Sequence, residues 1–209
     1  MEFRRKLYDK SIVQAQIPER IRDIVPSKDQ TKGWRKAANF YVNGKKNECE
    51  NYQREKMQKM LNGKIKKTNM RFNKENNEFK DMSNPNTRND GFEWTEDMDG
   101  VYTHLDLDTK FYINFKMVCD KGGAQTRTLR EVYDFIKAQC EWLLENSEED
   151  VMFINILDGD ESFRNKNKFE YLKNKYKSKK FEGIKDRIFI GDLYEFEETI
   201  CAPGLSLTQ

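Results

Sequence analysis

The spacing of hydrophobic and polar positions changes near residue 92. Residues 101–107 and 111–118 alternate between apolar and polar side chains, the period-two pattern of half-buried strands. The polar residues 108–110 between them suit a turn. The pattern therefore predicts a β-hairpin.

Longer elements follow the hairpin. Residues 125–146 place apolar side chains on one helical face, and residues 151–157 form a near-continuous apolar run, typical of a strand buried on both faces. A second helix is predicted over 163–176, a short buried strand over 187–191 and a terminal helix over 193–199. This order predicts an α/β fold with a mixed central β-sheet flanked by helices.

The first 91 residues carry weaker patterns. A proline followed by apolar residues three or four apart predicts a short helix over 17–25, and residues 45–61 have a helical composition. Residues 64–91 contain few apolar anchors and many Asn and Lys, so we expect a long loop there. The predicted organisation is a mostly helical and irregular N-terminal arm over 1–91 and a core over 92–209.

Composition narrows the classes of protein. The chain has 35% charged residues and a net charge of only +2, but its basic residues concentrate in the first 74 positions. Such a segment suits a polyanion such as nucleic acid, although a solvated helix face has the same composition. No window approaches the ~18 apolar residues of a membrane span, and the N-terminus lacks the apolar segment of a secretory signal, so we expect a cytoplasmic protein without a membrane partner.

Cysteine and histidine usage excludes several chemistries. Cys49, Cys119, Cys140 and Cys201 are scattered without a C-x-x-C pair, which predicts reduced residues rather than a disulfide framework or zinc cluster. The one histidine, His104, is too few for HExxH metalloproteases or two-histidine zinc sites. If the chain is an enzyme, we expect carboxylates and lysine to perform the chemistry.

Three carboxylates stand just before the first predicted strand, at Glu96, Asp97 and Asp99. Magnesium prefers one or two carboxylates together with waters and phosphate oxygens, so this cluster is a candidate metal site. A solvated acidic turn is the alternative interpretation.

A lysine, Lys116, interrupts a strand otherwise suited to burial. Asn114 and Lys116 share one face of that strand, and hairpin pairing would bring the acidic cluster near its end. A lysine there could offset charge on a phosphate or orient a water molecule. The alternative is an edge-strand lysine that prevents aggregation.

A Gly-Gly turn at 122–123 then leads into a polar helix start that contains Gln125, Arg127, Arg130 and Glu131. Backbone amides at such a start can bind phosphate. An exposed helix face with ion pairs is the alternative.

The order of acid, lysine, glycine turn and polar helix resembles the PD-(D/E)xK nucleases, specifically the type II restriction endonucleases. Asp99 matches the acid at the strand start, and the stretch 114–116 matches acid-x-lysine on the next strand, with Asn114 in place of the second acid. Some members carry the missing glutamate on the following helix, and Glu131 stands 15 residues after Lys116. The resemblance covers residues 92–192.

The resemblance implies a restriction-endonuclease-like fold and a Mg²⁺-dependent, sequence-specific endonuclease that cuts double-stranded DNA as a homodimer and leaves 5′-phosphates. Asp99 and Glu131 would hold Mg²⁺, with Glu96 as a further ligand. Lys116 would orient or deprotonate the attacking water, and Asn114 could lend an amide oxygen.

The resemblance also implies DNA contacts from Lys121, Gln125, Arg127 and Arg130, since Arg and Gln suit bidentate contacts with guanine and adenine. The arm over 1–91 would embrace DNA or mediate dimerisation.

Two other functions stay open. A non-catalytic DNA-binding protein on a degraded nuclease fold would suit the substitution at Asn114. A nucleotide- or methyl-transferring α/β enzyme could use Asp158 and Asp160, which follow a predicted strand, although no glycine-rich loop follows the first strand. An acidic turn at a helix start is the structural interpretation of those two residues.

Overall fold

A four-stranded mixed sheet organises the residues that the computed structural model describes, which are 48–83, 93–104, 109–118, 122–146, 150–176 and 186–200. Strand β3 (Gly100–Thr103) pairs antiparallel with β4 (Lys110–Met117). The parallel strands β5 (Val151–Asp158) and β6 (Ile188–Gly191) continue the sheet beyond β4. The hairpin and both later strands are confirmed; the helix expected over 17–25 lies outside the described residues.

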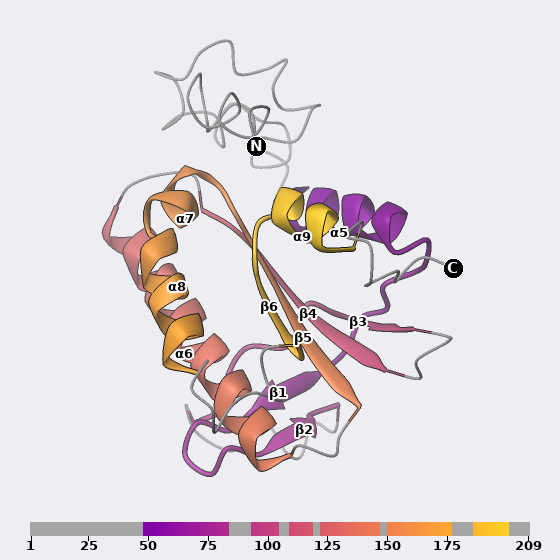
Figure 1. Ribbon diagram of the computed structural model, residues 1–209. Coiled ribbons are helices and arrows are strands. Elements are labelled where there is room, and N and C mark those ends of the chain that lie inside the picture. Colours follow the sequence, from indigo (N-terminus) through magenta and orange to yellow (C-terminus); the bar gives the residue numbers. More distant parts are fainter. Residues whose placement is uncertain are drawn as a thin grey trace.

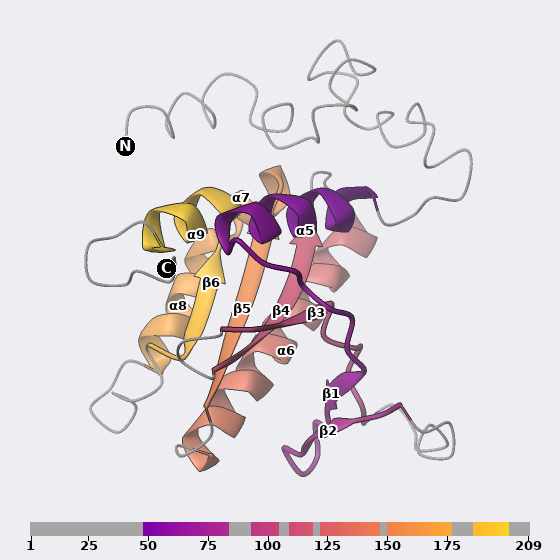
Figure 2. The same cartoon turned by 90° about the vertical axis from the view of Figure 1, so that its right-hand side faces the viewer.

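Helices cover both faces of the sheet (Figure 1). One face carries α5 (Glu48–Met60) and α9 (Leu193–Ile200), which Figure 2 shows side by side. The other face carries α6 (Gly123–Glu145) and α8 (Lys166–Lys175), with the short α7 (Asp160–Arg164) directly after β5. The predicted α/β fold with a mixed sheet flanked by helices is therefore confirmed.

The alternation along β4 distributes its side chains between these two helical layers. Phe111, Ile113 and Phe115 pack into the core cluster that includes α5 and α9 residues. Tyr112 packs into the cluster on the α6 side, with Trp142 from that helix. Because strand side chains alternate, Asn114 and Lys116 follow Tyr112 toward the α6 side, and they share one face of the strand as predicted.

Strand β5 lacks polar–apolar alternation because both of its faces are covered. Ile154 and Ile156 face the α5 layer, whereas Phe153 and Leu157 pack on the α6 side. A central parallel strand buried in this way has no solvated face to require polar residues.

The loop expected over 64–91 was wrong for residues 64–83. A ribbon of β1 (Met70–Phe72) and β2 (Phe79–Asp81) lies there, and Phe72 stacks on Phe79 with ring centroids 4.4 Å apart. Each strand has only three residues, too few to display a period, and the ribbon is held mainly by tertiary burial of Phe72. Residues 84–91 lie outside the described ranges.

Helix α5 belongs to the same core as the sheet. Met57 of α5 packs in one cluster with β4 and β5 side chains, and so do Leu61 and Ile65 from the segment after the helix. The division into an arm and a core at residue 91 stays a prediction, since the surrounding residues 84–92 are not described.

The helix expected over 163–176 is broken at Asn165, which ends α7 and precedes α8. Its Nδ2 donates to the Glu161 carbonyl at 2.8 Å. An asparagine side chain that binds backbone carbonyls competes with continuous helical hydrogen bonding, which accounts for the break.

A buried polar cluster joins α5, β5 and α9. Gln53 Nε2 donates to Asp158 Oδ2 at 2.6 Å and to the Lys116 carbonyl at 3.2 Å, and the Leu193 N–H donates to Asp158 Oδ1 at 3.2 Å. Burial, with a smaller contribution from Asp192, raises the pKa of Asp158 to about 7, although the bonds from Gln53 and Leu193 oppose that rise. The charge of Asp158, and therefore of this buried polar cluster, changes with pH near neutrality.

Asp158→Asn should make stability less sensitive to pH. The folded-state pKa of about 7 lies above the ~3.9 of an unfolded aspartate, so the contribution of Asp158 to stability falls as pH rises from about 4 to 7 and then levels off. Between pH 5 and 8 the wild-type free energy of unfolding should fall by up to a few kcal/mol more than that of the variant. Urea unfolding followed by circular dichroism measures both, with Asp186→Asn as the exposed control. Equal pH dependence in wild type and Asp158→Asn would contradict the assignment.

Candidate active site

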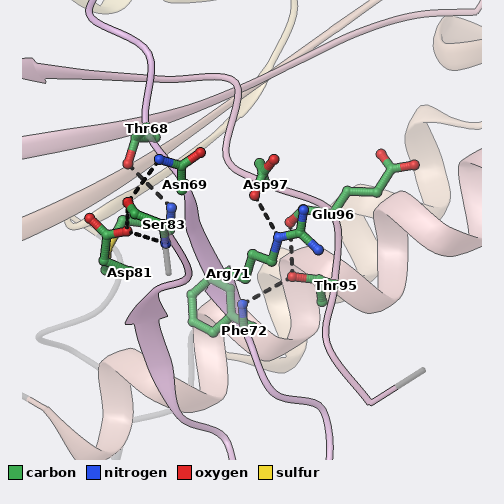
Figure 3. A network of polar contacts seen from close by, with 10 residues as sticks. Thr68, Asn69, Arg71, Phe72, Asp81, Ser83, Thr95, Glu96 and Asp97 are labelled. Carbon is green, nitrogen blue, oxygen red and sulfur yellow. Dashed lines mark hydrogen bonds and ion pairs between the residues drawn. The ribbon is translucent and has the colours of Figure 1, made fainter. Parts of the chain in front are cut away.

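The acidic stretch before β3 is held against the β1–β2 ribbon (Figure 3). The Thr95 N–H donates to the Phe72 carbonyl at 2.8 Å, and the Met98 N–H donates to the Met70 carbonyl at 2.9 Å. These bonds fix the backbone on both sides of Glu96 and Asp97, so the ribbon determines where the carboxylates begin.

Asp97 is bound to the β1–β2 ribbon by an ion pair. Arg71 Nε, on β1, donates to Asp97 Oδ1 at 2.5 Å, and Figure 3 shows the two side chains pointing toward one another. A carboxylate paired with arginine is a weaker candidate for a metal ligand than its neighbours. Asp97 therefore acts as an anchor for the stretch.

Asp99 lies where β3 meets the end of β4. Its Oδ2 accepts a hydrogen bond from the Phe115 N–H at 2.6 Å, and its carbonyl accepts one from Arg54 Nη2 at 2.7 Å. The next residue, Gly100, allows close approach, because a Cβ there would lie 2.4 Å from Ile65 Cγ2. Backbone and side-chain bonds together therefore fix this carboxylate beside β4.

Lys116 faces the same acidic stretch. Its Nζ lies 3.3 Å from Glu96 Oε2, and its side chain is only 21% exposed. Burial alone would lower the pKa of Lys116, but the negative charges of Asp99, Glu96 and Glu50 raise it above its ordinary value. The lysine is therefore a fixed ammonium at neutral pH rather than a neutral base.

Asp99 has the opposite electrostatic balance. Burial, with a smaller contribution from Glu50, raises the pKa of Asp99 to about 6, although Lys116, the Phe115 N–H and Arg54 all favour its ionised form. The carboxylate therefore gains and loses its proton close to neutral pH. Strongly shifted carboxylates next to a specific charge partner are typical of functional sites.

Glu50, in the first turn of α5, is a member of this cluster that the sequence analysis missed. Its charge raises the pKa of both Asp99 and Lys116. It stands 49 residues before Asp99 in a helix with few sequence signals, and only the packing of α5 against β4 brings it near. No local pattern could have identified it.

Asn114 is used inside the fold. It is 1% exposed, and its Nδ2 donates to Asn155 Oδ1 at 3.2 Å. Asn155 exchanges two further hydrogen bonds with Gln139, at 2.7 and 3.2 Å. The residue at the position of the second acid is thus part of a buried amide network between β4, β5 and α6.

The structure does not bring Glu131 to the Asp99–Lys116 cluster. Its side chain is 64% exposed, and its carboxylate lies 3.8 Å from Arg127 Nε on the same helix. The turn of α6 that buries Leu129 and Val132 against the sheet leaves position 131 toward solvent. The exposed position of Glu131 therefore gives no support to the metal-ligand role expected of it.

The structure describes the side chains of two of the four residues expected to contact DNA. Arg127 and Arg130 are exposed on α6. Lys121 and the side chain of Gln125 lie outside the described part of the chain, so their expected role stays a prediction.

The carboxylates of this cluster suit a magnesium ion in number. Among the described residues no group of three or more His, Cys, Asp or Glu side chains stands in a metal-binding arrangement. Magnesium usually takes one or two protein carboxylates and completes its shell with water and phosphate. Asp99 with Glu50 or Glu96 supplies that number, and Lys116 supplies a cation for the phosphate.

Comparison with known proteins leaves this geometry as the basis for assigning a function. No family model, curated protein or solved structure matches the chain. No described helix combines the length and the apolar character needed to cross a membrane.

Proposed function

We propose that the chain is a Mg²⁺-dependent endonuclease with a restriction-endonuclease-like fold, which hydrolyses phosphodiester bonds of double-stranded DNA in a sequence-specific way and leaves 5′-phosphates. The observation that carries the proposal is the meeting of Asp99 and Lys116 at the junction of β3 and β4. A half-buried acid just before β3 and a half-buried lysine on β4 suit a reaction in which negative charge develops on a phosphate.

Lys116 has the role of a positioned cation in this reaction. Glu96 holds its ammonium group from one side, and the negative charge of Asp99 keeps it protonated. A fixed ammonium can orient the attacking water and offset the charge that develops on the phosphate. Cleavage of the P–O3′ bond then leaves the phosphate on the 5′ end.

Asp99 and Glu50 or Glu96 are the groups that would hold the metal ion. When bound there, Mg²⁺ supplies a more acidic water and charge stabilisation at the phosphate. The Phe115 N–H keeps the Asp99 carboxylate in one orientation, which a metal ligand requires.

The partner is proposed to be duplex DNA bound by a homodimer in the cytoplasm. Symmetric cleavage of both strands calls for two active sites related by a two-fold axis. Arg127 and Arg130 on the exposed side of α6 supply cations for the backbone phosphates.

A second candidate is a DNA-binding protein without cleavage activity. The engagement of Asn114 in the amide network favours it, because that position then contributes no acid to the cluster. This candidate predicts duplex binding and no cleavage in any divalent metal.

Lys116→Ala and Asp99→Asn should each abolish cleavage of mixed plasmid DNA in Mg²⁺. Loss of one positioned charge-stabilising group typically costs roughly 10²- to 10³-fold in rate, so the discrete bands produced by the wild type should disappear. Agarose gels over a time course measure the effect, and Lys80→Ala, an exposed lysine on β2, is the matched control. Cleavage by Lys116→Ala at the wild-type rate would overturn the proposal.

Glu50→Gln and Glu131→Gln test two of the candidate partners of Asp99, the third being Glu96. The negative charge of Glu50 acts on Asp99, whereas Glu131 is 64% exposed on α6, so we expect Glu50→Gln to reduce the cleavage rate by roughly 10²-fold while Glu131→Gln cleaves like the wild type. The same plasmid assay over a Mg²⁺ titration measures both variants. The reverse result would assign the ligand role to Glu131.

A further inference from the structure

A groove of about 600 Å³ lies between α6 and α8, away from the Asp99–Lys116 cluster. Arg130 and Tyr133 line it from α6, Lys168 and Tyr171 from α8, and Asn165 from the break between α7 and α8. Its volume falls within the roughly 300–1,000 Å³ typical of sites for small ligands. Figure 1 shows both helices on the face of the sheet opposite α5 and α9.

The groove combines an apolar floor with aromatic walls. The floor contains Leu129 and Phe169, both buried, and the Tyr133 ring lies 6.1 Å from that of Phe169. Tyr171 is 66% exposed, the most exposed large hydrophobic side chain among the described residues. An exposed ring at the edge of a groove is well suited to stacking against a planar ligand.

The rim of the groove is basic. Within the described residues no acidic side chain forms an ion pair with Arg130 or Lys168, and Lys168 Nζ donates to Asn165 Oδ1 at 2.7 Å. Asp134 is the acidic residue of the lining, and α8 as a whole carries four lysines and one glutamate. Two cations beside aromatic rings suit a ligand that joins a flat ring to an anion.

The two helices that form the groove follow the parallel strands β4 and β5, which end at the same edge of the sheet. Helix α6 follows β4, which ends just after Lys116, and α7 and α8 follow the neighbouring parallel strand β5. Lys116 pairs with Leu157 in that register. A nucleic acid strand that reaches Lys116 therefore lies near the start of both helices that form the groove.

We propose that this groove binds an unpaired nucleotide of a DNA strand, with its base stacked on Tyr171 and its phosphate beside Arg130 and Lys168. A paired base shows only its edge, whereas an unpaired base has a free face for stacking. The inference rests on the proposed nuclease function, and it adds that one nucleotide of the strand leaves its pairing partner near the cut and enters the groove.

Binding of labelled oligonucleotides to the full chain in EDTA tests the groove without cleavage. Tyr171→Ala should weaken binding of a single-stranded 12-mer by roughly ten-fold or more, whereas Tyr171→Phe, which keeps the ring, should bind like the wild type. Binding of a blunt duplex of the same sequence should change less. Lys168→Ala should reduce the slope of log affinity against log salt by about 0.7 for the single strand, and Lys80→Ala serves as its control.

Equal single-strand affinity of Tyr171→Ala and wild type would overturn the groove assignment. Circular dichroism shows that each variant is folded. The plasmid assay separates the two proposals. If Tyr171→Ala weakens single-strand binding but the wild type cleaves no plasmid, the groove assignment holds and the nuclease proposal is wrong. If Lys116→Ala loses cleavage but Tyr171→Ala binds the single strand like the wild type, the nuclease proposal holds and the groove assignment is wrong.

Discussion

The hydrogen bond from the Phe115 N–H to the Asp99 carboxylate, 2.6 Å long, is the contact on which the site depends. It joins the start of β3 to the end of β4. The Asp99 carboxylate is thereby bound to the backbone of the residue that precedes Lys116. The register of the two strands sets this distance, because Gly100 lies opposite Ile113. A shift of one residue would turn the lysine to the other face of the sheet and remove it from the acids.

Partial burial strengthens the electrostatic interactions between Lys116 and the carboxylates around it. An ammonium that is mostly withdrawn from water is unfavourable unless it is paired, and Lys116 is kept charged by surrounding carboxylates. Burial is also unfavourable for the ionised carboxylate of Asp99. It raises the pKa of Asp99 to about 6, because the cationic neighbours offset the effect of burial only in part. A divalent cation at this point would offset the negative charges of the carboxylates, which is the physical reason for proposing a metal there.

Helix α5 connects the site to the rest of the core. Within two turns it places Glu50 in the charge cluster, Gln53 on the Lys116 carbonyl and on Asp158, and Arg54 on the Asp99 carbonyl. Because Asp158 also binds the start of α9, hydrogen bonds connect the ends of β4 and β5 to both helices of that layer. This use of Asp158 leaves the transferase alternative without an available carboxylate at that position.

The parts of the fold that could be predicted are those whose local pattern reports burial. The alternation of β4 and the apolar run of β5 identified the sheet, and the odd lysine at 116 pointed to the site. The rest depends on tertiary contacts that leave no local pattern. Phe72 anchors strands too short to show a period, Glu50 reaches the site only through packing of α5, and the amide partners of Asn114 come from β5 and α6.

Electron paramagnetic resonance of Mn²⁺, a magnesium substitute, tests the central claim most directly. The account predicts that the wild-type chain with a phosphorothioate duplex binds Mn²⁺, that Asp99→Asn abolishes this binding and that Glu131→Gln retains it. Binding of Mn²⁺ that is unchanged in Asp99→Asn would contradict the assignment of the Asp99–Lys116 cluster as the metal site.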